Sequence, residues 1–283
     1  MKIEIIDYKY KNYECIKFSN GVVDLLIPKK FGPRILYFGF KNQKNIFEEV
    51  EDVEFKNKYG VWKIYGGHRL WIAPESIETY YPDNDEVEIK SEAEGLVVSN
   101  CYKEIGIKKE ITLKFKDKNK VELIHRIYNI SKNTKEFSLW TLSVMCKNGV
   151  AVLPQNIKKS DKFGFLPTKN LVFWSYTDFK DKRLKITKDY IYIKQDPKIK
   201  RPLKIGQYLV SGWIGYKIDK YFFIKKLKSE IEPYPYVYYP DFTSNVEIYT
   251  SDKFLELEFV SKLYKIKKGE FGELKEEWEL NRC

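Results

Sequence analysis

Apolar and polar side chains alternate along short segments throughout the sequence, beginning with Ile3 and Ile5. Because successive side chains of a strand point to opposite faces, a period of two predicts half-buried β-strands. Turn-forming segments such as 117–120 separate these runs and suit hairpins. No window of comparable length has a helical period, apart from a short turn at 74–79. The sequence therefore predicts an all-β, antiparallel protein.

The strands follow one another without a linker rich in proline, glycine or serine. A chain of 283 residues with 43% hydrophobic content can bury a large core. Its 22 Tyr, 18 Phe and 6 Trp favour strands over helices. We expect a single domain over residues 1–283, built as a large antiparallel β-sandwich rather than as tandem domains.

Charge and cysteine content restrict the class of protein further. The net charge is +11, but the 51 basic residues are interleaved with 40 acidic ones, which favours a solvated surface over a nucleic-acid footprint. No apolar run is long enough for a membrane span, and acids interrupt the first residues, so we expect a cytoplasmic protein without a membrane partner. Four well-separated cysteines at 15, 101, 146 and 283 indicate incidental thiols rather than disulfides or metal ligands, and no metal or cofactor is expected.

The segment 59–75 interrupts the alternation most clearly. Gly66 and Gly67 allow a tight turn, and His68, Arg69 and Trp71 follow directly. An imidazole titrates near neutrality, a guanidinium donates in a fixed fork, and an indole offers a flat face to a pyranose. The segment therefore indicates a functional loop. The alternative is a structural loop in which His68 satisfies a backbone carbonyl and Trp71 fills core.

An acidic hairpin near the end of the chain is the second candidate. Alternation places Asn245 and Glu247 on one face with Glu256 and Glu258. If residues 251–252 form a two-residue loop, Glu247 lies opposite Glu256 and Asn245 opposite Glu258. Adjacent carboxylates favour one protonated partner, which is a usable acid/base arrangement. A solvated sheet edge neutralised by lysines is an equally good interpretation.

The other chemistry-bearing residue types give weaker signals. His125 alternates with Val121 and Leu123, which favours a structural sheet histidine. The sequence contains no glycine-rich phosphate loop, no zinc-binding helix and no serine nucleophile elbow. Phosphoryl transfer, zinc hydrolysis and serine hydrolysis therefore have no support.

Several motifs, taken in order, resemble the galactose mutarotase-like (aldose 1-epimerase-like) superfamily. They are Phe31-Gly-Pro-Arg-Ile-Leu36, Gly66-Gly-His-Arg-Leu-Trp71 with Pro74-Glu75, Gly212-Trp213 with Tyr216, Leu255-Glu-Leu-Glu-Phe-Val-Ser-Lys-Leu263, Lys268-Gly-Glu270 and Glu277-Trp278. The resemblance covers nearly the whole chain. It implies a β-supersandwich in which one concave sheet face binds a sugar.

In the epimerases of this superfamily, a histidine and a glutamate exchange protons with the sugar ring oxygen and the anomeric hydroxyl. The resemblance places the glutamate at Glu258 or Glu256. The strand resembling the one with the central acid histidine, 137–145, contains no histidine here, which argues against ordinary mutarotation. His68 replaces that acid only if its loop reaches the same face.

Two hypotheses follow for function. In the first, the chain is a sugar-binding protein or aldose epimerase with Glu258 or Glu256 as general base and His68 as acid or orienter. The expected substrate-binding residues share polar or aromatic character near these groups: Arg34, Arg69, Trp71, Trp213, Asn245 and Glu247. In the second, the chain is a non-catalytic carbohydrate-binding or sensing domain. A third interpretation makes the aromatic face a surface for another protein.

Overall fold

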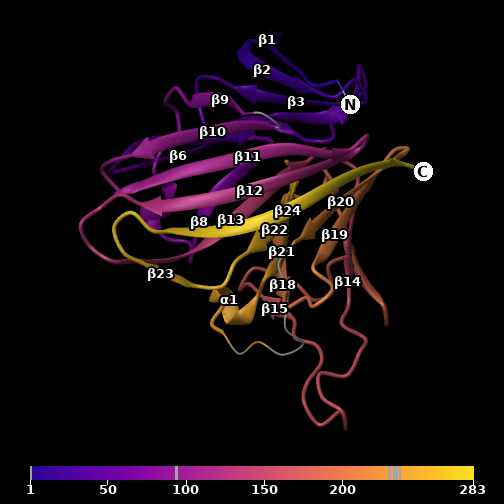
Figure 1. The fold of residues 1–283 in the computed structure, drawn as a ribbon. Helices are drawn as coiled ribbons and strands as arrows, with labels where there is room; N and C mark the ends of the chain where they lie inside the picture. Colours follow the sequence, from indigo (N-terminus) through magenta and orange to yellow (C-terminus); the bar gives the residue numbers. More distant parts are fainter. Residues whose placement is uncertain (1, 93–94, 229–230, 232–234, 236) are drawn as a thin grey trace.

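Antiparallel strands form almost the whole of the described chain, as the alternation predicts. The computed structural model describes residues 2–92, 95–228, 231, 235 and 237–283. Within these residues, strands β1 to β24 join into two large sheets and two small ones. Figure 1 shows β10, β11, β12 and β24 crossing the front of the molecule, with β13, β22 and β21 behind them. The predicted all-β sandwich is confirmed.

The front sheet has ten antiparallel strands. In spatial order the strands are β16 (Leu184–Ile186), β17 (Tyr190–Lys194), β14 (Val150–Pro154), β19 (Trp213–Ile218), β20 (Tyr221–Leu227), β24 (Phe271–Arg282), β12 (Lys120–Asn129), β11 (Ile107–Asp117), β10 (Gly95–Tyr102) and β9 (Glu88–Glu92). The predicted hairpin at 117–120 joins β11 to β12.

The second large sheet carries the candidate site. In spatial order its strands are β15 (Val172–Phe173), β18 (Leu203–Gln207), β21 (Val246–Thr250), β22 (Leu255–Val260), β13 (Lys135–Met145), β8 (His68–Ala73) and β4 (Arg34–Ile35), and β23 (Tyr264–Ile266) pairs with one end of β13. We call this the site sheet.

Smaller elements flank the sandwich. A four-stranded sheet contains β1 (Glu4–Tyr10), β2 (Tyr13–Ser19), β3 (Val23–Pro28) and β5 (Tyr37–Phe40), and β6 (Glu49–Asn57) pairs with β7 (Gly60–Gly66) as a separate hairpin. The helical content of the described residues is one 3₁₀ turn, η1 (Ile77–Tyr80), and one further turn, α1 (Pro240–Thr243). η1 overlaps the short turn predicted at 74–79. Neither turn is long enough or apolar enough to cross a membrane.

The inner faces of the two large sheets bury one continuous hydrophobic core. On β22 the core-facing residues are Leu255, Leu257 and Phe259, and none of them is accessible to solvent. The ring of Trp278 on β24 meets Phe223 on β20 edge to face, with ring centroids 5.6 Å apart. Burial of such aromatic side chains supplies much of the stabilisation, at about 25 cal/mol per Å² of apolar surface. The alternate residues of β22 must then point away from this core.

Candidate functional site

The outer face of the site sheet gathers the charged residues. Alternation on β22 turns Glu256 and Glu258 away from the core, and on β21 it does the same for Glu247. β18 adds Lys204 and β8 adds Arg69 to this face. All five side chains are buried. The site is therefore a set of buried ionisable groups rather than a solvated sheet edge.

The register of the acidic hairpin differs from the sequence prediction. Glu247 lies opposite Glu258, and Glu256 lies opposite Tyr249. The loop spans Ser251 to Phe254, where the Ser251 N–H donates to the Phe254 carbonyl oxygen over 3.0 Å, so two extra residues shift the pairing. The predicted opposition of Glu247 to Glu256 and of Asn245 to Glu258 is wrong. The predicted common face of the three glutamates is correct, because the register shifts by two residues, and only an odd shift would bring Glu247 to the other face from Glu256 and Glu258.

Lys204 neutralises the most deeply buried pair of carboxylates. Its Nζ lies 2.7 Å from Glu247 Oε2 and 2.9 Å from Glu258 Oε2. The Trp140 indole N–H donates to the same Glu258 oxygen over 2.8 Å. The ammonium also lies 4.6 Å from the ring centroid of Trp140 and 4.7 Å from that of Trp174. Paired charges with hydrogen bonds and ring contacts can remain ionised out of water, which an isolated carboxylate cannot do.

Arg69 and Glu256 form a second ion pair beside the first. Arg69 Nη2 lies 3.1 Å from Glu256 Oε1, and the guanidinium lies over the rings of Trp71 at 4.6 Å and Trp62 at 5.4 Å. Trp71 itself is stacked between Trp62 and Trp140, with centroids 5.3 Å apart on each side. Its indole N–H donates to the Thr79 carbonyl. Trp71 is thus a buried support for Arg69, and its faces are covered by other indoles rather than open to a sugar.

Protonation differs between the carboxyls of this face. Burial raises the pKa of the Glu256 carboxyl to about 7, although Arg69 opposes the shift. Burial also raises the pKa of Glu247 well above its usual value, against the opposing charge of Lys204. For Lys204, burial lowers the pKa but the two carboxylates outweigh it and hold the pKa well above its usual value. A carboxyl whose pKa lies near 7, Glu256, beside one that is paired with an ammonium, Glu258, can exchange protons with a substrate.

Several buried polar atoms of this face remain without a partner. Glu258 Oε1 and both Arg69 Nε and Arg69 Nη1 make no hydrogen bond within the described part of the chain. Buried polar atoms in native proteins are nearly always satisfied, and exceptions gather at functional sites. These atoms therefore mark where a ligand or ordered water would bind.

His68 does not reach this face. A tight turn precedes it, in which Gly66 and Gly67 have φ of 88° and 67°. A Cβ at Gly66 would lie 2.0 Å from the Glu48 carbonyl oxygen, so only glycine fits there. Strand β8 begins directly afterwards, and its alternation sends Arg69 to the outer face and His68 into the core. The predicted role of His68 as acid or orienter beside the glutamates is therefore wrong.

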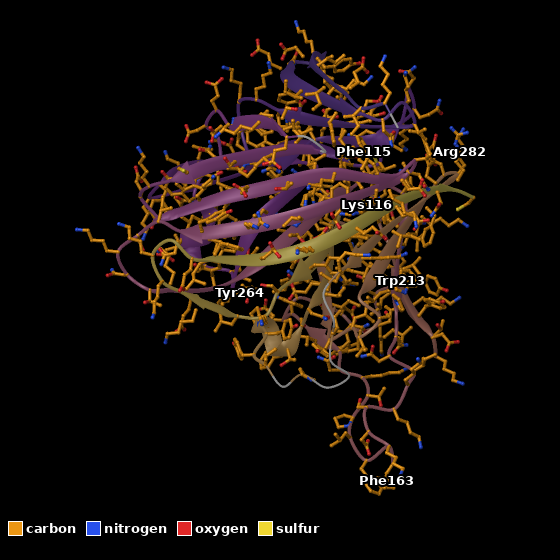
Figure 2. The ribbon with its side chains drawn as sticks, viewed as in Figure 1. Phe115, Lys116, Phe163, Trp213, Tyr264 and Arg282 are labelled. Atoms are coloured by element: carbon orange, nitrogen blue, oxygen red, sulfur yellow. The ribbon has the colours of Figure 1, made fainter. Side chains whose placement is uncertain are left out.

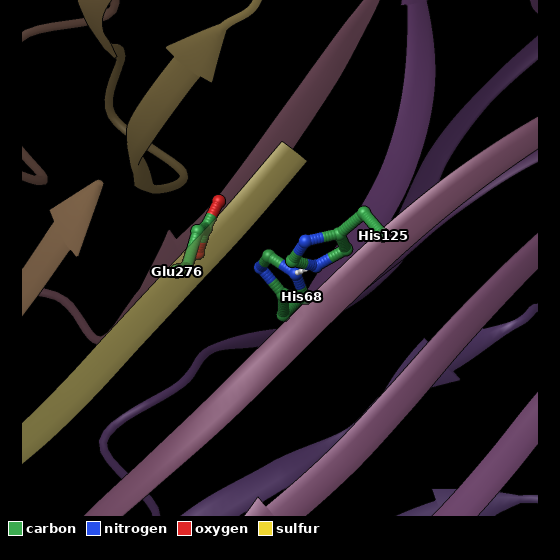
Figure 3. Close-up of side chains that lie close together, drawn as sticks. All are labelled: His68, His125 and Glu276. Atoms are coloured by element: carbon green, nitrogen blue, oxygen red, sulfur yellow. Dashed lines mark hydrogen bonds between the residues drawn. The ribbon is translucent and has the colours of Figure 1, made fainter. Parts of the chain in front are cut away.

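His68 instead belongs to a buried polar cluster between the sheets (Figure 3). Its Nε2 lies 2.8 Å from His125 Nε2, and its Nδ1 lies 2.9 Å from Ser143 Oγ. His125 Nδ1 donates to the Leu274 carbonyl over 3.1 Å, so in a neutral ring His125 Nε2 accepts the hydrogen bond that His68 Nε2–H donates. Burial lowers the pKa of His125 to about 4 and that of His68 well below its usual value, so both rings are neutral at pH 7.

The same cluster offers the geometry of a metal site. Ligand atoms of His68, His125 and Glu276 lie within 4.8 Å of one another. Glu276, however, already accepts from Trp278 Nε1 over 2.8 Å and from the Thr141 hydroxyl, and its Oε1 lies 3.4 Å from Lys225 Nζ. The positive charge that Glu276 requires is thus supplied by lysine. We interpret the cluster as a hydrogen-bonded structural network, and the sequence interpretation of His125 as a structural histidine agrees with it.

Two other predicted site residues, Arg34 and Asn245, have structural partners away from the glutamates. Arg34 is fully buried, donates to the carbonyls of Ile64 and Gly66 over 2.8 and 2.7 Å, and pairs with Asp83 at 2.9 Å. The amide of Asn245 exchanges hydrogen bonds with the Leu209 backbone.

Trp213 lies on β19 of the ten-stranded sheet, away from the site sheet (Figure 2). Of the predicted set, the structure brings together Arg69, Trp71, Glu247, Glu256 and Glu258.

A cavity of about 700 Å³ adjoins this group of charges. We call it the aromatic cavity, since its lining contains Phe173, Trp174, Tyr238, Tyr239 and Phe242. It is lined as well by Pro74, Val172, Ser175, Asp241 and Thr243. Trp174 connects it to the glutamates, because the other contact of this ring is the Lys204 ammonium. A cleft of this size, largely aromatic with a few polar groups, has the character of a small-molecule site.

Lys204, Trp140 and Trp174 are central to the site but are not among the residues predicted from the sequence. Lys204 is one of 51 basic residues, and nothing in its neighbourhood marks it as buried. Trp140 could have been assigned to the outer face of the site sheet from alternation, because it has the same strand parity as Leu142, which lies opposite Glu258 in the acidic hairpin. Trp174 directly follows the two-residue strand β15, which is too short to have a detectable period.

The comparisons with known proteins support the architecture. No family model and no curated protein sequence matches the chain. Among solved structures, a galactose mutarotase-like protein from Lactobacillus casei shares 8% identity at a TM-score of 0.54, covering 94% of this chain and 100% of that one. A galactose mutarotase-like protein from Clostridium acetobutylicum shares 10% identity at a TM-score of 0.51, covering 99% of each chain. The fold is galactose mutarotase-like.

A third solved structure also matches over nearly the whole length of both chains. The Slr1438 protein of Synechocystis sp. PCC 6803 shares 9% identity at a TM-score of 0.60, covering 98% of this chain and 99% of that one. At these identities the mutarotase-like likeness describes the backbone alone. The chemistry of this chain must be argued from its own residues.

Proposed function

We propose that this protein binds a sugar on the outer face of its site sheet and opens and closes the sugar ring there by acid/base catalysis, as an aldose 1-epimerase does. The observation that carries the proposal is the convergence of Glu247, Glu256 and Glu258 under cover beside the aromatic cavity. Nothing in the packing of the core requires three buried carboxylates on that face. Their burial is costly unless a ligand or a reaction uses them.

The chemistry divides between two glutamates. Glu258, whose Oε2 accepts from the Lys204 ammonium and the Trp140 indole N–H, is the base that removes the proton of the anomeric hydroxyl. Glu256 is the acid that protonates the ring oxygen as the C1–O5 bond breaks, giving the open-chain aldehyde. Rotation about C1–C2 and reversal of the two proton transfers close the ring as the other anomer. No atom is lost, and both carboxyls return to their starting state.

Glu256 thereby takes the part that the resemblance assigns to a histidine. Its carboxyl has a pKa of about 7, which is near the ordinary value of an imidazole. General acid/base catalysis is most effective when the pKa lies close to the working pH, and contributes about a hundred- to ten-thousand-fold in rate. A strand without the central histidine is therefore compatible with the reaction.

The test is the rate of anomer exchange measured by NMR for a panel of free aldoses. We expect acceleration over buffer for at least one sugar, with a hundred-fold or greater loss of that acceleration in Glu256→Gln and in Glu258→Gln. The matched control is Glu122→Gln on β12 of the ten-stranded sheet, which should leave the rate unchanged. Buffer-level exchange for every sugar of the panel would refute the catalytic proposal.

A non-catalytic sugar-binding or sensing domain is the second candidate. It is favoured by the complete burial of Glu247 and Glu258 and by their neutralisation through Lys204. Calorimetry decides between the two: sugar binding without anomer exchange, unchanged in Glu258→Gln, would establish the second.

We also propose a cytoplasmic location. All four cysteines are free in the structure, whereas exported proteins more often pair their thiols as disulfides. We expect all four thiols to react with an alkylating reagent when the purified protein is unfolded in denaturant without prior reduction.

A further inference from the structure

The aromatic cavity has a lining of unusual chemistry for so basic a protein. Five of its described lining residues are aromatic, and Asp241 is the only charged one among them. The whole chain has a net charge of +11, so an average pocket would contain lysine or arginine. Aromatic faces around a carboxylate form the environment in which proteins bind ammonium groups, because the ring quadrupole and the carboxylate both attract a cation.

The charged groups behind the cavity also favour a cationic ligand. Burial raises the pKa of the Asp241 carboxyl, while the nearby charge of Lys204 and a hydrogen bond with Glu247 oppose that rise. The Lys204 ammonium is already held by Glu247 and Glu258 at 2.7 and 2.9 Å. Asp241 therefore has no cation of its own within the described lining of the cavity. An anionic ligand would meet this excess of carboxylates, whereas a cationic one would complete it.

Lys204 shows that this part of the fold accommodates an ammonium. Its Nζ lies between the rings of Trp140 and Trp174, at 4.6 and 4.7 Å from their centroids, with carboxylates at hydrogen-bonding distance. Trp174 lines the aromatic cavity as well. One indole thus serves an internal ammonium and also the cavity beside it.

The backbone that presents Asp241 is strained. Asp241, Phe242 and Thr243 have φ of 50°, 52° and 67°, three consecutive non-glycine residues in the left-handed region. Phe242 is 89% exposed, although it lines the cavity. Strained residues and an exposed aromatic ring persist where the conformation serves a ligand. The turn places the carboxylate and the ring at one opening.

We propose that the aromatic cavity binds the ammonium group of an amino sugar, with Asp241 as its counter-ion and Trp174 and Phe242 as ring contacts. This inference rests on the proposed function for the sugar and adds the class of sugar. It predicts that a hexosamine is preferred to the neutral hexose and to the N-acetylated hexosamine, which carries no charge.

The test is calorimetric binding of D-glucosamine, D-glucose and N-acetyl-D-glucosamine to the native protein and to two variants. We expect glucosamine to bind at least ten-fold more tightly than either neutral sugar. Asp241→Asn should abolish that preference without unfolding the turn, because asparagine also adopts the left-handed conformation. Phe242→Ala should weaken all three sugars.

A matched control separates loss of a ring contact from loss of surface area. Phe165 is 85% exposed and belongs to the projecting loop that carries Phe163 at its tip (Figure 2), outside the aromatic cavity. Phe165→Ala should bind all three sugars as the native protein does.

The outcomes distinguish the two levels of the argument. Equal affinity for glucosamine and glucose, or a preference that survives Asp241→Asn, would overturn the amino-sugar inference and leave the proposed function standing. Absence of binding for all three sugars, together with buffer-level anomer exchange, would overturn both. An ionic-strength series supplies a further check, since the preference should decline as salt screens the charge pair.

Discussion

Replacement of Lys204 by methionine tests whether its ammonium holds the site together. The variant keeps most of the side-chain volume, but it removes the ammonium that lies over the rings of Trp140 and Trp174 and leaves Glu247 and Glu258 without their cation. Each carboxylate loses one charge-assisted contact, at 2.7 and 2.9 Å. Hydrogen bonds to charged groups contribute about 1.5–3 kcal/mol each. The sum agrees with the roughly 3–5 kcal/mol lost when one partner of a buried ion pair is removed.

The assay is equilibrium unfolding in urea at pH 7 and at pH 4.5. We expect Lys204→Met to lower the free energy of unfolding by about 3–5 kcal/mol at pH 7. The loss should be smaller at pH 4.5, because burial raises the pKa of the Glu247 carboxyl and its protonated form needs no cation. Adding Glu247→Gln to the variant should recover part of the loss at pH 7, since one buried charge is removed.

The control is Lys44→Met, which removes an exposed pair with Asp219 at 3.0 Å. Exposed pairs contribute little, so its unfolding midpoint should hardly move. If Lys204→Met at pH 7 were no more destabilised than this control, the ammonium would not stabilise the buried carboxyl groups, and the assignment of Glu258 as the base would lose its support.

Three further predictions concern stability. Since one pKa unit is worth about 1.4 kcal/mol, the rise of the Glu256 pKa from 4.5 to about 7 should cost roughly 3 kcal/mol of stability as pH rises between those values, and Glu256→Gln should remove that decline in urea unfolding. The histidines have the opposite sign: stability should fall as pH drops from 6.5 to about 4, and His68→Leu combined with His125→Leu should flatten this acid limb. Arg34→Lys should lower the free energy of unfolding by about 2 kcal/mol, measured in the same way, because it leaves two buried carbonyls unsatisfied.

Strand parity accounts for what the sequence could predict. The alternation along β21 and β22 placed Glu247, Glu256 and Glu258 on one face, and that assignment is correct. Parity also determines the faces of His68 and Arg69, because adjacent residues of strand β8 point to opposite sides of the sheet. The mistake was to interpret the residues after Gly67 as a loop, where side-chain directions are free.

Other features could not be predicted because they depend on contacts between distant segments. The pairing of Glu247 with Glu258 depends on a four-residue loop whose length is not visible in the alternation. Lys204 is brought to Glu258 by strand order, since β18 and β22 both pair with β21. Trp174 contacts Lys204 from the irregular segment that follows β15, where no periodic signal exists. Burial of a lysine is decided by such neighbours, not by its own sequence context.

The stack of Trp62, Trp71 and Trp140 gives the molecule a built-in optical reporter. The three indoles are nearly parallel, with neighbouring ring centroids 5.3 Å apart, and the last of them, Trp140, donates its N–H to Glu258. Any event that changes the charge or occupancy around this carboxylate should therefore alter the ultraviolet emission of the protein. Ligands can be screened by tryptophan fluorescence on the unlabelled native chain, before any of them is known to react.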